Sequence, residues 1–379
     1  MQVCIVGGGM ITHDQLLPSL YQLQREGVIS SIMLCARRRA TLRALHSTTL
    51  SRVFPKQSFQ ATTQSYREAI AALPPRQIVA VAVPDHLHYE VILAALEHDQ
   101  HVLCVKPLVL QVRQSLEIQR KARARGLLVA VDYHKRFDDR SLLARRLYRE
   151  GAFGEFRLGH ARLFEKWHYR HSNFQKWMTA EHSDAFTYIG CHYVDLVAFI
   201  TGLLPAAVSV YGVRDRFPNR KEAFLWTDAR VIWNNGACLN VQNGLGYPDD
   251  APGANTQGLT LYCAGRDQGA LLEHSDQYRG LKYSFIEKPD VPGATIYAEP
   301  SPDYFQYVDG VPVGYGYRSI ERIVTSIINV ESHPKDRAKL LAEIHRAGII
   351  ATATNSSYND KVIEAARRSI VSGGKQVRV

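Results

Sequence analysis

The chain has 379 residues, of which 46% are hydrophobic and 22% charged. This composition excludes a disordered, collagen-like or low-complexity protein, and the length predicts two domains. The formal net charge of +10 favours anionic partners such as phosphates, sugar acids or nucleic acid, and composition alone does not choose among them.

Several features predict a cytoplasmic protein. No stretch approaches the roughly 20 apolar residues that a membrane helix needs, so no membrane partner is expected. The chain opens on the apolar run 2–6 instead of a basic leader. Its 6 cysteines are far apart and form no C-x-x-C pair, so the sequence predicts reduced thiols, no disulfide framework and no metal site.

The first 130 residues alternate short apolar runs with helical patterns. This order is typical of an α/β domain, in which helices cover both faces of a doubly wound, Rossmann-type parallel sheet. We therefore expect a first domain at 1–130. The expected strands are 2–6, 29–35, 78–83, 101–104 and 127–131, and the clearest helices are 90–96 and 112–125.

The pattern changes after residue 130. A basic helical segment reaches residue 150, and strands without regular helices between them follow. Such a run predicts an α+β domain at 131–379 with a large, mostly antiparallel open sheet, and the open face favours a homodimer or homotetramer. The last helices are free to pack back on the first domain. The expected elements are strands 156–164, 208–213, 229–233, 237–241 and 259–263, and helices 320–329 and 336–353.

A glycine turn, Gly7-Gly8-Gly9-Met10-Ile11-Thr12, joins the first strand to the first helix. A dinucleotide's pyrophosphate needs bare backbone N–H groups and a helix N-terminus at this place. We predict cofactor contacts at Gly7, Gly9, Met10 and Ile11. Thr12 stands where a third glycine or alanine is common, which predicts looser helix packing. The alternative is a merely tight strand-to-helix connection.

The second strand ends in Cys35-Ala36-Arg37-Arg38-Arg39, where NAD-binding proteins usually carry Asp or Glu. Without that carboxylate, guanidinium groups such as those of Arg37 and Arg38 can bind a 2′-phosphate. The sequence therefore predicts NADP as the preferred cofactor and NAD as the alternative. A second interpretation is that these arginines are simply a solvated helix start.

Two further segments follow strand ends, where ligands of open α/β sheets bind: Val83 to His88, and His101 to Pro107. With the glycine turn, the segment Tyr133 to Arg136, and Gly190 to Asp195, they make the chain resemble the glucose-fructose oxidoreductase, inositol dehydrogenase and rhizopine-catabolism (Gfo/Idh/MocA) family. The resemblance covers nearly the whole chain.

The resemblance implies that Lys106 lies between the nicotinamide and the substrate carbinol, with Pro107 fixing its backbone and Pro84 and His88 serving the cofactor. An ammonium group there would bind the reacting hydroxyl and stabilise developing alkoxide character. Val105 replaces the family's usual Glu, which puts the tuning of Lys106 in doubt. A later Glu287-Lys288-Pro289 is discounted because it lies far from any strand-to-helix junction.

The resemblance also implies that His192 accepts the carbinol proton, with Asp195 three residues on as a partner. The family commonly has an aspartate four residues before the histidine, whereas this chain has Tyr188. If the segment is an α-helix, Tyr188 and His192 share a face, so the phenol becomes a candidate proton relay. The alternative is a His192 packed as a core residue.

The segment from Phe164 to His171, with Trp177, is dense in aromatic and polar side chains that suit sugars. Trp167, Tyr188, His192 and Asp195 are the candidate substrate contacts here, together with Lys106 and Arg136 from the other segments. Packing at an oligomer contact is the alternative for the aromatic residues. For Arg136, the cofactor, the substrate and the hinge between domains remain open.

Three functions compete. The first is an NAD(P)-dependent oxidoreductase that moves hydride between a nicotinamide cofactor and a secondary hydroxyl or ketone of a sugar, sugar derivative or cyclitol. The second is a redox-neutral glycosidase or lyase of the same family, and the third a catalytically inactive cofactor- or sugar-sensing regulator. Val105 and Tyr188 favour the third, whereas Lys106 and His192 oppose it. No nucleic-acid-binding motif is found, so no nucleic acid partner is expected.

Overall fold

The computed structural model describes residues 1–46, 49–251, 253–265, 268–275, 284–287, 295–298 and 302–379. Contacts divide the chain into two compact units, Met1–Phe137 with Pro302–Ser357, and Asp138–Ser301 with Tyr358–Val379. The sequence placed one boundary near residue 130 and left the packing of the last helices open. In the structure, the first unit reaches seven residues further and takes α10 and α11, while most of α12 belongs to the second unit.

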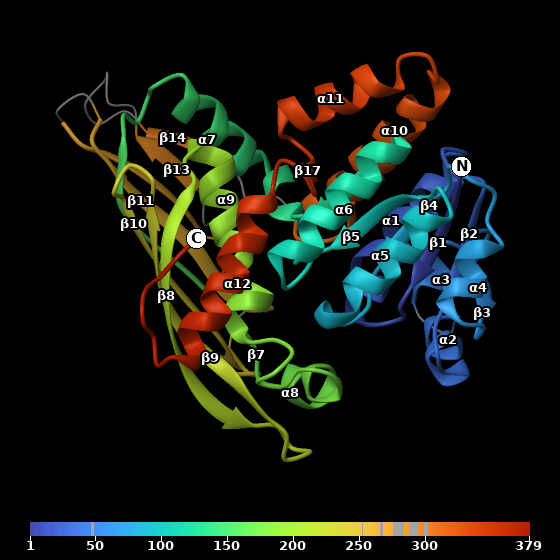
Figure 1. The fold of residues 1–379 in the computed structure, drawn as a ribbon, viewed down its shortest axis with the longest axis horizontal. Helices are drawn as coiled ribbons and strands as arrows, with labels where there is room; N and C mark the ends of the chain where they lie inside the picture. Colours follow the sequence, from blue (N-terminus) through green and yellow to red (C-terminus); the bar gives the residue numbers. More distant parts are fainter. Residues whose placement is uncertain (47–48, 252, 266–267, 276–283, 288–294, 299–301) are drawn as a thin grey trace. The chain divides into compact units, whose positions relative to one another are not determined.

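The first unit is built on a 7-stranded sheet with the order β17-β6-β5-β4-β1-β2-β3. All neighbouring strands are parallel except β17, which runs antiparallel to β6. The predicted Rossmann-type sheet is therefore confirmed (Figure 1). The strands are β1 (Gln2–Val6), β2 (Ser31–Cys35), β3 (Gln60–Thr62), β4 (Ile78–Val81), β5 (His101–Val105), β6 (Val129–Asp132) and β17 (Ala351–Thr352).

Helices cover both faces of this sheet. On one face, apolar side chains of α1 and α10 form a continuous core with alternate residues of the strands, such as Ile5, Ile78 and Leu103. On the other face, α5 and α6 pack against each other and against β4, β5 and β6. No helix in the described part of the chain is long and apolar enough to cross a bilayer. The helices are α1 (Leu17–Arg25), α2 (Arg39–His46), α3 (Leu50–Val53), α4 (Tyr66–Ala71), α5 (His88–Glu97), α6 (Val112–Arg125), α10 (Tyr315–Ser332) and α11 (Arg337–Ala347).

Two expected elements differ from the structure. The predicted helix at 336–353 is wrong at its end, because Gly348 adopts a left-handed φ of 61° and ends α11, after which 351–352 form β17. Strand β3 was not predicted, since it has only 3 residues and little burial to give it an apolar pattern.

The second unit is built on a 9-stranded sheet with the order β14-β13-β12-β11-β7-β10-β9-β8-β18. Its described strand pairs are antiparallel except β7 with β10, which confirms the predicted mostly antiparallel sheet. The strands are β7 (Phe156–Lys166), β8 (Pro205–Arg216), β9 (Glu222–Trp233), β10 (Cys238–Tyr247), β11 (Asn255–Cys263), β12 (Ala270–Ser275), β13 (Ser284–Glu287), β14 (Thr295–Ala298) and β18 (Val377–Arg378); the first unit also holds the hairpin of β15 (Gln306–Val308) and β16 (Val311–Val313).

Helices of the second unit lie along one face of its sheet (Figure 1). On the other face, Leu158 of β7 and its partner Tyr262 of β11 are exposed. An association of copies through this face stays a prediction. The helices are α7 (Asp139–Arg149), α8 (Tyr169–Ser172), α9 (Cys191–Thr201) and α12 (Ser357–Val371).

An ion cluster ties α10 and α11 to the amino-terminal edge of the first sheet. The Leu128 amide donates to Nδ1 of the buried His101, so Nε2 carries the proton and donates to Glu331 at 2.9 Å. Arg337 donates to both oxygens of the same carboxylate, at 3.0 and 2.7 Å, and Arg76 lies 3.6 Å away. Burial raises the pKa of Glu331, but the hydrogen bonds from His101 and Arg337 outweigh it and lower the pKa to about 2.

We expect Glu331→Gln to lower the free energy of unfolding by about 1–3 kcal/mol at pH 7, since two arginines lose their counter-charge. Stability should also fall as the pH falls. Burial lowers the pKa of His101 below 6.5, so as the pH falls through 6.5 the unfolded chain protonates His101 before the folded chain does. Below pH 4.5 the unfolded chain likewise protonates Glu331 first, because the folded chain has the lower pKa. Thermal unfolding between pH 7 and pH 3 measures both effects.

The matched control is Glu343→Gln, which neutralises an exposed carboxylate of α11. It should leave the melting temperature and its pH dependence unchanged. Equal effects of the two substitutions would show that the cluster contributes nothing.

Candidate active site

The glycine turn lies at the carboxyl ends of β1, β2 and β4. Gly7 has φ +114°, and a Cβ there would lie 2.1 Å from the Ala82 carbonyl oxygen, so no other residue fits. A Cβ at Gly8 would lie 2.7 Å from Thr41 of α2. At Gly9, by contrast, a Cβ would have no atom within 4 Å. The turn is thus closed on its protein side and open at Gly9, which fits the approach of a pyrophosphate.

Helical structure begins at Met10 and passes through a π-helical turn at Thr12–Leu16 before α1. Thr12 is fully buried, and its hydroxyl donates to the Gly7 carbonyl at 2.9 Å. Thr12 therefore ties the turn to the helix, where the sequence predicted looser packing. The π turn directly precedes Pro18, whose missing N–H cannot complete an α-helical ladder at this point.

The predicted arginines follow β2 at the same edge of the sheet. Arg37, Arg38 and Arg39 are all exposed, and none has an ion-pair partner in the part of the chain that the structure describes. Three solvated guanidinium groups next to the glycine turn can bind a 2′-phosphate. A solvated helix start fits the same geometry, so the NADP preference stays a prediction.

His88 links the ends of β4 and β5. It is fully buried, with Nε2 2.8 Å from the Val83 carbonyl oxygen and Nδ1 2.7 Å from that of Pro107. Pro84 begins the short 3-10 turn that precedes it. The imidazole therefore holds the backbone around Pro107, and any effect on a cofactor would act through that backbone. A direct cofactor contact stays a prediction.

Lys106 follows β5 directly, and its peptide bond to Pro107 is cis. Since β5, β4, β1 and β2 are adjacent parallel strands, Lys106, Pro84, the glycine turn and Arg37 follow strand ends at one edge of one sheet. This is the arrangement that the sequence predicted for the first unit. The discounted Lys288-Pro289 lies outside the described residues, and Glu287 ends β13.

Arg136 also belongs to the first unit. Its side chain is buried, and it donates to the Gly348 carbonyl at 3.2 Å, at the end of α11. Nearby, the buried Asp132 accepts hydrogen bonds from Gln15 at 2.7 Å and from Ser319 at 2.6 Å. Arg136 thus helps to fix the end of β6 and the chain that follows it. A contact with cofactor or substrate stays a prediction.

In the second unit, α9 carries His192, which is buried. Two residues of α12 hold this helix: the Tyr358 hydroxyl donates to Asp195 at 2.9 Å, and the Asn359 amide donates to the Cys191 carbonyl at 2.9 Å. Asp195 is therefore bonded across to α12, and the predicted pairing with His192 stays a prediction. Sequence reasoning missed the two α12 residues, because no local pattern signals a partner more than 160 residues away.

Tyr188 lies in a second π-helical turn, Phe186–Gly190, directly before α9. The shared face with His192 assumed an α-helix, so it does not follow from the spacing through this wider turn. Tyr188 is half-buried against an aromatic pair, with ring centroids 4.9 Å from Phe174 and 5.6 Å from Trp177. The predicted aromatic segment and Tyr188 are thus brought together.

Gly190 allows this turn to approach the sheet. A Cβ there would lie 2.6 Å from the side-chain oxygen of Asn243 on β10 and 2.6 Å from the Phe186 ring. At the other end of the turn, the buried Asp184 accepts from the Thr187 amide at 2.7 Å and its hydroxyl at 2.8 Å, and pairs with Arg367 of α12 at 3.2 Å. Asp184 therefore holds the start of this turn and ties it to α12.

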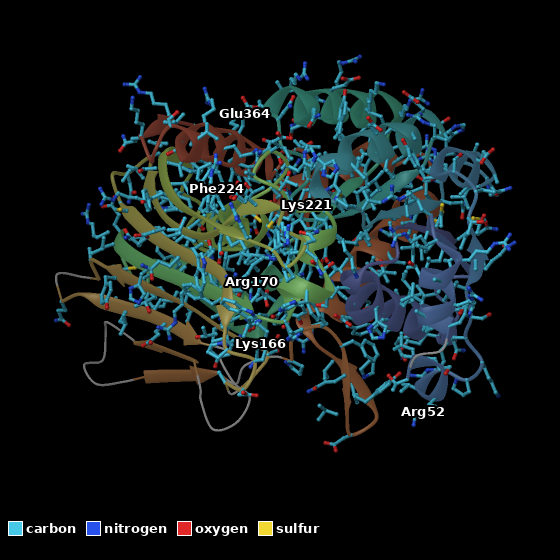
Figure 2. The ribbon with its side chains drawn as sticks, turned by 90° about the horizontal axis from the view of Figure 1, so that it is seen from below. Arg52, Lys166, Arg170, Lys221, Phe224 and Glu364 are labelled. Carbon is cyan, nitrogen blue, oxygen red and sulfur yellow. The ribbon has the colours of Figure 1, made fainter. Side chains whose placement is uncertain are left out.

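Trp167 follows β7 and remains 42% exposed, with the Arg170 guanidinium 3.8 Å from its ring centroid. Arg170 and Lys166 are buried near the ends of the strands of the second sheet (Figure 2). The sequence analysis named Trp167 but missed the role of Arg170. The local signal for that role is weak, because it consists of an arginine three residues after a tryptophan.

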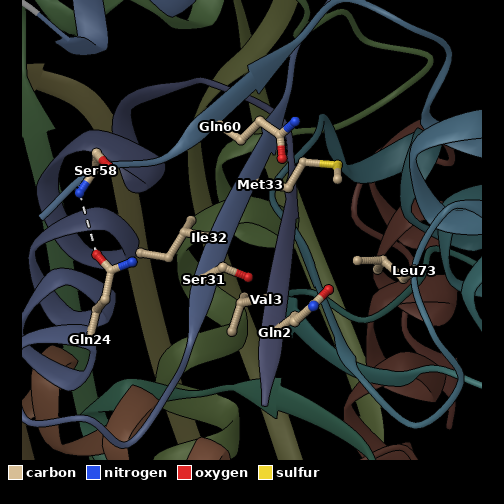
Figure 3. Close-up of a pocket in the computed structure, with 9 residues that line it drawn as sticks. All are labelled: Gln2, Val3, Gln24, Ser31, Ile32, Met33, Ser58, Gln60 and Leu73. Atoms are coloured by element: carbon tan, nitrogen blue, oxygen red, sulfur yellow. Dashed lines mark hydrogen bonds between the residues drawn. The ribbon is translucent and has the colours of Figure 1, made fainter.

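A hollow of about 270 Å³ lies at the amino-terminal edge of the first sheet, lined in part by Gln2, Gln24 and Gln60 (Figure 3). This edge is opposite to the one that carries the glycine turn. None of the predicted site residues lines the hollow. The site residues therefore form two groups, one in each unit, and the convergence of Lys106 with His192 stays a prediction.

Comparisons with known proteins agree with this geometry. A model described as "Oxidoreductase family, NAD-binding Rossmann fold" matches residues 1–133, and one described as "GFO/IDH/MocA C-terminal domain" matches 141–263. The chain is 24% identical over 313 residues to 2,7-anhydro-N-acetylneuraminate hydratase of Mediterraneibacter gnavus, covering 76% of this chain and 80% of that protein. It is 25% identical over 349 residues to levoglucosan dehydrogenase of Pseudarthrobacter phenanthrenivorans, covering 82% and 83%.

Among solved structures, an inositol dehydrogenase homolog from Azotobacter vinelandii, complexed with NADH and myo-inositol, superposes with a TM-score of 0.73. The match covers 100% of this chain and 97% of that one at 18% identity, so it supports the fold alone. The two family matches together cover more than half of the chain, with the NAD-binding domain first and the C-terminal domain second, as predicted. The chain therefore belongs to the Gfo/Idh/MocA family of oxidoreductases, whose N-terminal domain is an NAD-binding Rossmann fold.

Proposed function

We propose that this protein is an NAD(P)-dependent dehydrogenase that oxidises a secondary hydroxyl of a sugar, sugar derivative or cyclitol, or reduces the matching ketone. The observation that carries the proposal is the position of Lys106, which follows β5 at the sheet edge that also bears the glycine turn. Relatives named as dehydrogenases of levoglucosan, D-glucosides and inositol support the substrate class.

The nicotinamide cofactor supplies the hydride acceptor or donor when it is bound. The Lys106 ammonium then donates a hydrogen bond to the reacting oxygen and stabilises its developing negative charge. His192 accepts the hydroxyl proton, and Tyr188, from the turn before the same helix, is proposed to relay it. Arg136 and Trp167 are proposed to bind the substrate, with Trp167 at a part of it away from the reacting carbon.

A second candidate is a redox-neutral reaction, in which a bound cofactor would take hydride from the substrate and return it to the intermediate after elimination or hydration. The similarity to a hydratase favours it. The two candidates differ in one measurement, because only a dehydrogenase changes the absorbance of free NAD(P)H in proportion to product.

For the cofactor, we propose NADP in preference to NAD. Three exposed arginines follow β2, and no Asp or Glu stands among residues 35–39. A carboxylate there would repel a 2′-phosphate, whereas a guanidinium group binds it in a charge-assisted hydrogen bond.

Lys106→Met should strongly slow hydride transfer and leave cofactor binding largely intact, because it removes the charge and keeps the approximate length of the side chain. We expect a loss of about 10²–10⁴-fold in kcat. The wild type is first screened with sugars, cyclitols, sugar acids and nucleotide sugars and both cofactors; the variant is then assayed with the best substrate, and its NAD(P)H affinity is measured by fluorescence.

A Lys106→Met variant with full turnover would refute the assignment of Lys106. A wild type that turns over no member of the screen, yet binds NAD(P)H, would favour the regulator.

Arg37→Ala should weaken the binding of NADPH about tenfold more than that of NADH, because it removes one charge-assisted bond to the 2′-phosphate. Fluorescence titration with both cofactors measures the ratio. The control is Arg52→Ala, which removes an exposed arginine of α3 in the same unit (Figure 2). Equal losses for both cofactors would overturn the preference.

Gly9→Ala should raise the Kd for NAD(P)H at least about tenfold without changing the melting temperature. The added methyl group meets no protein atom within 4 Å, but it occupies the open side of the turn. Gly7→Ala is the contrasting variant, since its methyl group would clash with Ala82 and should lower both stability and affinity. Unchanged affinity in Gly9→Ala would place the pyrophosphate elsewhere.

A further inference from the structure

Trp167 is exposed and yet held in place. Its amide donates to the Tyr247 carbonyl of β10 at 2.9 Å, and its own carbonyl accepts from the Arg170 amide at 3.0 Å. The Arg170 guanidinium covers one face of the indole at 3.8 Å. Trp167 is still 42% exposed, so part of its surface is accessible to a ligand. A fixed aromatic face of this kind costs little conformational entropy when a ligand stacks on it.

Arg170 is itself held from three sides. Its Nη1 donates to Asp215 of β8 at 2.7 Å, its Nε donates to the Leu245 carbonyl of β10 at 2.5 Å, and the Trp226 ring lies 5.3 Å away. Trp226 can lie across β10 only because Gly246 has no side chain, since a Cβ there would lie 1.7 Å from the indole. The support of Trp167 is therefore built from three strands of the sheet.

Two carboxylates flank this platform. The Asp215 side chain is 39% exposed and is bonded to Arg170; the Asp249 side chain is 46% exposed and accepts from the His168 amide at 2.9 Å. The hydrogen bond from that amide is the main cause that lowers the pKa of Asp249. Burial raises the pKa of Asp215, but the hydrogen bonds from Arg170, the Arg216 amide and Trp226, together with the charge of Arg170, lower it overall. Both groups are therefore ionised acceptors at neutral pH.

The platform is connected to the proposed catalytic helix through α8. Tyr169, next to Arg170, has its ring 6.3 Å from that of Phe174, and Phe174 lies 4.9 Å from Tyr188. The rings of Tyr188, Phe174 and Tyr169 thus form a chain of contacts within one unit that ends two residues along the chain from Trp167.

We propose that Trp167, with Asp215 and Asp249 beside it, binds a second, neutral sugar residue of the substrate, so that the protein acts on glycosides or oligosaccharides in preference to free monosaccharides. This inference rests on the proposed function. An indole face matches the C–H face of a pyranose, and the two carboxylates accept hydrogen bonds from its hydroxyl groups. Their negative charge disfavours an acidic sugar at this position.

The test measures binding and turnover separately. Calorimetry on the full chain, loaded with whichever of NADPH and NADH binds more tightly, compares D-glucose, cellobiose and maltose for the wild type, Trp167→Ala and Trp167→Phe. We expect a disaccharide to bind more tightly than glucose, Trp167→Ala to raise the Kd of the disaccharide about tenfold, and Trp167→Phe to retain most of the affinity. The Kd of glucose should change less than about twofold, and in turnover KM should rise with kcat unchanged.

The control variant is Leu204→Ala, which removes a side chain of 50% exposure at the opposite end of β8 and should change nothing. Equal effects of Trp167→Ala on glucose and disaccharide, or no effect, would overturn the proposal. A change in molecular mass in solution would instead assign Trp167 to a contact between copies. The binding measurement does not depend on turnover. A catalytically inactive wild type would therefore contradict the proposed function, while the disaccharide affinities would still test the role of Trp167.

Discussion

The structure depends on one geometrical constraint, which is that adjacent parallel strands end at the same edge of a sheet. In the order β5-β4-β1-β2, each strand delivers a different group to that edge: Lys106, Pro84, the glycine turn and Arg37. The strands can stand so close only because Gly7 lacks a Cβ, which would lie 2.1 Å from the Ala82 carbonyl oxygen. A side chain at this position would force the ends of β1 and β4 apart, and Lys106, Pro84 and the glycine turn would no longer lie at one edge.

Buried hydrogen bonds also fix the backbone at this edge of the sheet. His88 joins the carbonyls of Val83 and Pro107, and Thr12 returns its hydroxyl to Gly7. These residues are buried and present no functional group to solvent. Their contribution to a reaction lies in fixing the backbone from which Lys106 and the turn amides project. If this backbone became less well ordered, activity would fall although no reacting group is removed.

The first unit could be predicted from the sequence largely because its information is local. Apolar runs of four to five residues, glycines at a strand end and a lysine after β5 each carry meaning within a few positions. The partners of the second unit are not local: Tyr358 and Arg367 reach Asp195 and Asp184 from α12. The π-helical turn at Phe186–Gly190 was also invisible, since the sequence pattern does not distinguish it from an α-helical turn.

The same contacts bear on the proton chemistry of the proposed function. Relative to the family pattern, the chain lacks one carboxylate beside Lys106, where Val105 stands, and another beside His192, where Tyr188 stands. Asp184 is committed to Thr187 and Arg367, and Asp195 accepts from Tyr358. In the proposed function, the proton of the substrate hydroxyl passes to the imidazole of His192 and the phenol of Tyr188, and the pairing of Asp195 with His192 stays a prediction. A phenol can pass a proton between an imidazole and water, so Tyr188 is proposed as a relay and not as the group that keeps the proton. In the proposed chemistry the roles are therefore divided: Lys106 stabilises the developing charge on the reacting oxygen, and the imidazole and the phenol handle the proton.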